Sequence, residues 1–343
     1  MNVLDKVLTL RPTSVVSRLG HASRLPVLNP RELLKALEGV PAALPCVPVP
    51  ARPMLPGLLA AARGEDAVLG LMCPHPLADR GAAERFMAGV QQVAEADGHA
   101  RPLFLQAGPV RVPNSDAETL SQLQQGVYRL VEAGFPLVSL DVSRLPVDAA
   151  VEAVRRLSGP VVERELALEV SLPGVDAGAE LDGARSLLAG LRGLGLRFLR
   201  VSAITLGEEE PDVEFLRSLV ELAGQSGVGV SVGEAGRRSV RVLPTYVAAG
   251  VRKVDCAAPF ERLALGMYPE AVRSSLEQKA EKAGLEAGEL LGVLGEQLAP
   301  LGALEAMRLE ALTFAEAADV LALVGARRTG WKSMLFLADN RGE

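Results

Sequence analysis

The sequence predicts a (β/α)8 barrel that continues into an extended helical region at its C-terminal end. Eight short segments that are almost wholly apolar recur along the chain, as expected for parallel strands buried on both faces. Segments with helical periodicity separate them. Strands follow one another at intervals of roughly 30 residues, which is the spacing of right-handed βαβ units. An open, doubly wound sheet is the alternative arrangement of the same units.

We expect the eight strands at residues 45–50, 67–74, 102–108, 137–143, 166–173, 198–205, 228–236 and 251–259. The first segment, PCVPVP, fits a strand least well because it contains three prolines, which cannot donate hydrogen bonds to a sheet.

The helices are recognised by their end signals. Residues 29–39 begin with Asn29 as a plausible N-cap and Pro30 at the first helical position. Residues 115–134 show Ser115 as the cap, a glutamate three residues later and a closing glycine. Three further helical segments each end in glycine, at 146–159, 182–195 and 211–227.

The helical pattern extends well beyond the last strand. We therefore divide the chain into an N-terminal arm (1–28), the barrel (29–270) and a C-terminal helical extension (271–343). A barrel needs only one helix after its eighth strand. The surplus has a Leu/Ala stripe with charged residues between, which fits packing on the barrel or on a partner subunit. We expect a homodimer, with a possible protein partner at these helices.

Composition excludes several classes of protein. The chain has 343 residues, is 49% hydrophobic and carries a net charge of −6, which argues against a nucleic acid or an anionic membrane as the main partner. Its three cysteines are far apart and form no CxxC pair. The first residues carry scattered charges and no unbroken apolar stretch, unlike a signal peptide. We expect a cytoplasmic protein.

Carboxylates close four of the expected strands: Asp141, Glu169, Glu234 and Asp255. Because the chemistry of such barrels lies where the strands end, these positions are the candidate site. Strand ends are also polar simply because they are exposed. That explanation is weaker for Asp141 and Glu169, which lie within apolar runs where an unpaired carboxylate is costly. Other candidate ligand-binding residues near strand ends are His75, Gln106, Arg111, Arg144 and Ser202.

Metal binding is limited by the scarcity of histidine. Of the three histidines, His21, His75 and His99, only His75 follows a strand, so a site with several imidazoles cannot form. We expect no cofactor. Magnesium held by the carboxylates, or zinc, is the alternative. Lys253 is the only lysine on an expected strand, and its place at the strand's start argues against Schiff-base chemistry.

A glycine-flanked turn follows the seventh strand. Gly233 and Gly236, followed by Arg237 and Arg238, could hold a phosphate through backbone N–H groups. A solvated turn with a basic cap explains the same residues equally well.

Two segments carry a family resemblance. YVAAGVRKVDCAAPFERLAL (246–265) and VYRLVEAGFPLVSLDVS (127–143) resemble the corresponding segments of class II ketose-bisphosphate aldolases, and the order of elements agrees over roughly residues 29–270. PLFLQAGPVRVPN (102–114) is similar to the accessory branch of the tagatose-bisphosphate aldolases. The resemblance implies a barrel, a sugar-phosphate ligand and a zinc ion that polarises the substrate carbonyl.

The zinc ligands of that family are not present. The Asp-His pair at the third strand is replaced by Gln106 and Ala107, and the later histidines by Ser202 or Ala203 and by Val232 or Gly233. Of the family's site, Asp141 and Glu169 remain in full. The family's phosphate-binding loop is reduced to residues 233–236. Of the family motif that aligns with residues 255–259, only Asp255 remains.

Two functions follow from this pattern. The first is a non-catalytic aldolase-like barrel, a pseudoenzyme with an accessory, scaffold or sugar-phosphate-binding role. The second is an enzyme of altered chemistry, a lyase or epimerase acting on a small sugar phosphate or hydroxy acid, with Asp141 and Glu169 as acid/base groups. A closed or apolar mouth would favour the first function, and carboxylates converging with an arginine would favour the second.

Overall fold

The computed structural model describes residues 2–173, 181–207, 209–294 and 298–340. Eight parallel strands form a closed barrel in which each strand pairs with the next and the first pairs with the last. The expected (β/α)8 barrel is therefore confirmed. The strands are β1 (Leu44–Pro48), β2 (Leu69–Cys73), β3 (Leu103–Arg111), β4 (Leu137–Asp141), β5 (Ala167–Ser171), β6 (Leu196–Ser202), β7 (Gly229–Gly233) and β8 (Lys253–Asp255).

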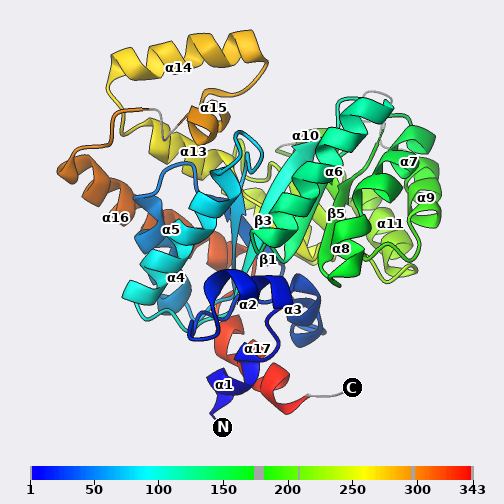
Figure 1. Cartoon of the computed structure of the whole chain (residues 1–343), viewed down its shortest axis with the longest axis horizontal. Coiled ribbons are helices and arrows are strands. Elements are labelled where there is room, and N and C mark those ends of the chain that lie inside the picture. Colours follow the sequence, from blue (N-terminus) through cyan, green and yellow to red (C-terminus); the bar gives the residue numbers. More distant parts are fainter. Residues whose placement is uncertain (1, 174–180, 208, 295–297, 341–343) are drawn as a thin grey trace.

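Helices surround the strands (Figure 1). The outer layer comprises α4 (Met54–Gly64), α5 (Ala82–Ala96), α6 (Ala117–Glu132), α7 (Val147–Leu157), α8 (Gly159–Glu163), α9 (Leu181–Gly190), α10 (Ala203–Leu206), α11 (Val213–Gly224), a 3-10 turn (Val240–Val242) and α12 (Leu243–Ala248). After β8 come α13 (Ala258–Leu265), α14 (Glu270–Ala283), α15 (Ala287–Leu294), α16 (Ala303–Leu323) and α17 (Thr329–Asp339).

The ring of helices is completed by α16, which packs against α4 and also contacts α12. Gly57 of α4 permits this close approach, because a Cβ atom there would lie 2.3 Å from the carbonyl oxygen of Glu310. The eighth outer helix is thus supplied by residues beyond 270. The chain leaves the ring after α13, forms α14 and α15, and then returns.

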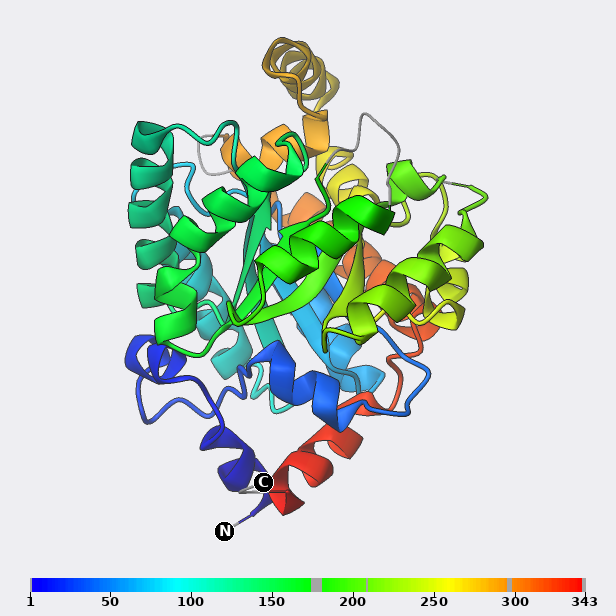
Figure 2. The same cartoon turned by 90° about the vertical axis from the view of Figure 1, so that its right-hand side faces the viewer.

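The two ends of the barrel are covered differently. At the end where the strands begin lie α1 (Val3–Leu8), α3 (Pro30–Ala36) and α17 (Figures 1 and 2). Their apolar side chains, with Val7, Leu33 and Met334 among them, join inward-facing residues such as Phe104 and Phe198 in one buried cluster. A further helix, α2 (Thr13–Leu19), lies against α6. The floor of the barrel is therefore apolar and closed.

The helix-end signals were nearly right. Asn29 caps α3, accepting from the Arg31 N–H, and Pro30 stands at the first helical position as expected. At α6 the cap is Asp116 instead of Ser115, because the Asp116 carboxylate accepts from both the N–H and the hydroxyl of Thr119. None of the described helices is both long and apolar enough to cross a membrane.

Candidate functional site

The candidate site is a set of polar side chains inside the barrel, supplied by five consecutive strands. Because side chains alternate along a strand, each strand contributes residues two apart. They are Ser139 and Asp141 of β4, Glu169 and Ser171 of β5, Arg200 and Ser202 of β6, Ser231 and Gly233 of β7, and Lys253 and Asp255 of β8. Glu169 and Lys253 are fully buried.

Glu169 and Lys253 form an ion pair deep in the barrel. The Lys253 ammonium lies 2.8 Å from Glu169 Oε1 and also donates to Asp255 Oδ1. Glu169 accepts two further hydrogen bonds, from Ser231 Oγ at 2.7 Å and from Ser139 Oγ at 2.6 Å. Both carboxylate oxygens of Glu169 therefore accept hydrogen bonds, as a buried charge requires.

Arg200 and Asp255 lie above this pair, toward the mouth. Arg200 Nε is 3.5 Å from Asp255 Oδ2, and both residues are more than nine-tenths buried. Neither of these two atoms has a hydrogen-bond partner among the described residues. The guanidinium rests on Gly233, where a Cβ atom would lie only 2.1 Å from Arg200 Nη2. The two side chains thus form a buried ion pair in which neither of these atoms makes a hydrogen bond.

The environment separates the acidities of the two buried carboxyls. Burial favours the neutral form of Glu169, but the charges of Lys253 and Arg200 outweigh it and lower the pKa of that carboxyl. For Asp255, burial and the neighbouring charge of Glu169 prevail over Lys253, and its pKa is raised. Of the two carboxyls, Glu169 is therefore the stronger acid and Asp255 the weaker one. Such a divergence between neighbouring carboxyls marks acid/base sites.

Asp141 and Glu234 are predicted residues whose charges act on Arg200. Asp141 Oδ1 accepts from Ser171 Oγ at 2.9 Å and from the Ser143 N–H at 3.0 Å. Although burial opposes them, these bonds lower the pKa of Asp141. Ser202 donates to Glu234, whose charge is one of those acting on Arg200. Gln106 is fully buried across the barrel and accepts from Cys46 Sγ at 3.4 Å.

The remaining predicted residues lie at the rim or outside. Arg111 forms an ion pair of 2.6 Å with Glu289 of α15, and His75 lies against Gly292 of the same helix. The side chain of Arg144 is exposed. The structure thus brings together the residues on β4 to β8, whereas the predicted arginines do not join them.

The predicted phosphate turn is enclosed. Gly236 is buried with φ +74°, and a Cβ atom there would lie 2.9 Å from Cys256 Sγ. Arg237 pairs with Glu286. Gly233 faces Arg200. Steric demands within the chain therefore account for both glycines.

Four residues of the site were missed from the sequence: Ser139, Arg200, Ser231 and Lys253. Each stands two positions before a residue that was identified, so the two-residue repeat of a strand would have placed all four inside. Lys253 was expected at the wrong end of the barrel. The stagger of the strands instead sets it beside Ser231, the middle residue of β7.

The residues do not fit a zinc site. Within the described ranges, no group of three or more His, Cys, Asp or Glu side chains could hold a metal ion. The carboxylates at the mouth are interleaved with two fixed cations, Arg200 and Lys253, which would repel a divalent ion.

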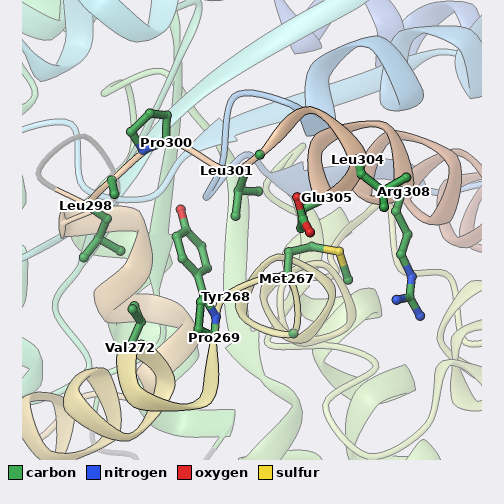
Figure 3. A pocket seen from close by; sticks show the side chains of 13 residues that line it. Met267, Tyr268, Pro269, Val272, Leu298, Pro300, Leu301, Leu304, Glu305 and Arg308 are labelled. Carbon is green, nitrogen blue, oxygen red and sulfur yellow. The ribbon is translucent and has the colours of Figure 1, made fainter.

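A separate cavity of about 600 Å³ lies outside the barrel, between the α13–α14 corner and the start of α16. It is mainly apolar, with Tyr268 pointing between Leu298, Pro300 and Leu301 (Figure 3). None of the predicted site residues lines it.

Comparison with solved structures shows a shared fold. The YdjI aldolase from Escherichia coli K12 superposes with a TM-score of 0.61 at 12% identity, covering 88% of this chain and 98% of that one. A candidate fructose-1,6-biphosphate aldolase from Coccidioides immitis gives 0.55 at 14% identity, covering 86% and 95%. No protein-family model matches the sequence, and a sequence comparison with curated proteins gives no match.

Proposed function

We propose that this chain is an enzyme of the lyase or epimerase class that acts on a small hydroxylated carbonyl compound at the barrel mouth. The observation that carries the proposal is the buried ion pair of Arg200 Nε and Asp255 Oδ2, 3.5 Å apart, in which neither atom makes a hydrogen bond. Unsatisfied buried polar atoms are rare in folded proteins and call for an explanation. Carboxylates converging on an arginine were also the arrangement expected of the catalytic alternative.

A substrate hydroxyl satisfies both atoms at once. Its oxygen accepts from Arg200 Nε–H, and its proton is donated to Asp255 Oδ2. Asp255, with its raised pKa, takes that proton, while Arg200 stabilises the negative charge on the oxygen. In a lyase reaction the oxygen then forms a carbonyl, and the adjacent C–C bond breaks. The electron pair passes into an enolate of the second product, and the enolate carbon takes the proton back from Asp255.

The other groups have supporting roles. Asp141 stays ionised, since its pKa is lowered, and supplies a hydrogen-bond acceptor at the mouth. We assign Glu169 a supporting role in place of the acid/base role expected from the sequence. Its carboxylate already accepts hydrogen bonds from three donors. Arg200 is the cation best placed for an anionic end group of the substrate, a carboxylate or a phosphate.

The proposal is tested with a panel of three- to six-carbon keto sugar phosphates and hydroxy acids in deuterium oxide, followed by proton NMR. Wild type should exchange or cleave at least one compound, and Asp255→Asn should slow this at least about 100-fold, as loss of an acid/base group does. The exposed residue Glu163 provides the matched control, Glu163→Gln. Equal rates in wild type and Asp255→Asn would overturn the proposal.

A non-catalytic, ligand-binding barrel is the second candidate. It is favoured by the saturated Glu169–Lys253 pair and by α15, which covers part of the mouth through Glu289 and Gly292. In that case the same panel would yield binding without exchange, and Asp255→Asn would retain the ligand. Aldolase-like sugar-phosphate binding would then be its role.

A further inference from the structure

We infer that Lys253 is a built-in cation that takes, inside this barrel, the place of a metal ion, and that it is the positioning residue for Asp255. The placement of the Lys253 ammonium is argued from geometry alone. The positioning role rests on the proposed function.

The ammonium is surrounded by groups that suit a cation. Lys253 is fully buried, and its Nζ is bound by Glu169 at 2.8 Å and by Asp255. On another side lies the face of Phe198, with its centroid 5.7 Å from Nζ, within the range of a cation–π interaction. Cys46 is close enough for the charge of Lys253 to act on its thiol.

The charges inside the barrel do not favour a metal ion, which would be a third cation beside Lys253 and Arg200. Lys253 and Arg200 together face Glu169 and Asp255, so these carboxylates are already balanced by chain-borne positive charge. The pKa of the Lys253 ammonium is raised, since the two carboxylates more than offset its burial. The charge is therefore permanent and, unlike that of a metal, cannot be lost to the solvent.

Lys253 also fixes the orientation of Asp255. It holds Oδ1, which leaves Oδ2 as the one oxygen turned to Arg200. A second-layer group that orients an acid or a ligand in this way usually stands behind a metal ligand. In this barrel, the Lys253 side chain alone both orients Asp255 and balances its negative charge.

Chemical rescue tests the seat of the ammonium. Lys253→Ala removes three methylene groups and the ammonium, which together are propylammonium. Propylammonium should raise the melting temperature of Lys253→Ala by a few degrees, because a ligand that binds only the native state stabilises it. The same concentration should leave wild type unchanged. 1-Propanol should not rescue the variant, and Lys253→Met, which fills the space without charge, should not respond to the amine. Equal rescue by 1-propanol would show that only space is being filled and would overturn the inference.

A metal titration gives a test that does not need Lys253→Ala to fold. Wild type and Asp255→Asn, stripped with a chelator, are titrated with zinc and with magnesium by calorimetry. We expect no difference between them. A metal ion that binds wild type and is lost in Asp255→Asn would overturn the inference. Neither readout depends on turnover, so an absence of activity would remove the proposed function and the positioning role of Lys253, but not the placement of its ammonium.

Discussion

At the scale of single residues, Gly233 controls the position of Arg200. Gly233→Ala would place a Cβ atom 2.1–2.4 Å from three atoms of the guanidinium, so the guanidinium must leave its present position beside Asp255. The cost in unfolding free energy should be modest, at most about 2 kcal/mol, because the end of a flexible side chain can shift. The Nε–H resonance of Arg200 in ¹⁵N-labelled protein should change markedly, and urea unfolding measures the stability.

Gly224 provides the control for this substitution. A Cβ atom there meets nothing within 4 Å, so Gly224→Ala should leave the Arg200 resonance unchanged. An unchanged resonance in Gly233→Ala as well would mean that Arg200 does not rest on Gly233, and the site as described would be wrong.

At the scale of elements, α15 lies at the mouth beside a cluster of acidic residues whose protonation affects its docking. Glu261 of α13 packs against Gly288. Burial, with Glu289, Glu286 and Glu234 nearby, raises the pKa of Glu261 to about 7, while Arg262 opposes this. Arg111 and Arg237 hold Glu289 and Glu286 from β3 and from the turn after β7. The ion pairs with Arg111 and Arg237 therefore stabilise the docking of α15, and the repulsion among the glutamates weakens it.

The direction of the pH dependence follows from the raised pKa. Between the ordinary glutamate pKa of about 4.3 and about 7, Glu261 keeps its proton only when α15 is docked. Docking therefore weakens as the pH rises through this range and stays weaker above it. Hydrogen–deuterium exchange of residues 287–294, corrected for intrinsic rates, should be faster at pH 8 than at pH 5.

Glu261→Gln should remove most of this difference, because the amide stays neutral at both values. Exchange in β4 and β5 serves as the internal reference and should not respond. Protection of α15 that is the same at pH 5 and pH 8 in wild type would contradict the assigned ionisation.

The strands were readable from the sequence, but the inner site was only partly so. Strands buried on both faces leave a continuous apolar signal, and all eight were located. This apolar signal does not reveal the register, that is, which residues of neighbouring strands lie opposite each other. β8 spans only Lys253–Asp255, and nothing local to those residues reveals that Lys253 lies opposite Ser231 of β7. The ion pair with Glu169, 84 positions away in the sequence, depends on how the closed barrel staggers its strands.

At the scale of the whole molecule, exposed apolar side chains are concentrated on the last two helices. Seven of the ten large apolar residues exposed in the described ranges lie on α16 and α17. Leu304 and Met307 are the most exposed, at 75% and 68%, and they stand one turn apart at the start of α16. Leu304 also borders the apolar cavity beside Tyr268 (Figure 3).

The exposed side chains of Leu304 and Met307 and the neighbouring cavity form one surface patch. This patch suits a two-fold interface, in which each copy supplies both the projecting side chains and the cavity. We therefore expect a homodimer formed through the start of α16, since apolar patches of this kind commonly mark interaction sites.

Sedimentation velocity at micromolar concentration should give twice the 36.1 kDa chain mass for wild type and the single mass for Leu304→Asp/Met307→Asp. Tyr128→Asp, at an exposed aromatic residue of α6, is the matched control and should stay dimeric. Because α16 also completes the barrel ring, both variants must first match wild type in circular dichroism. A wild type that sediments as a monomer, or a double variant that remains a dimer, would refute this interface.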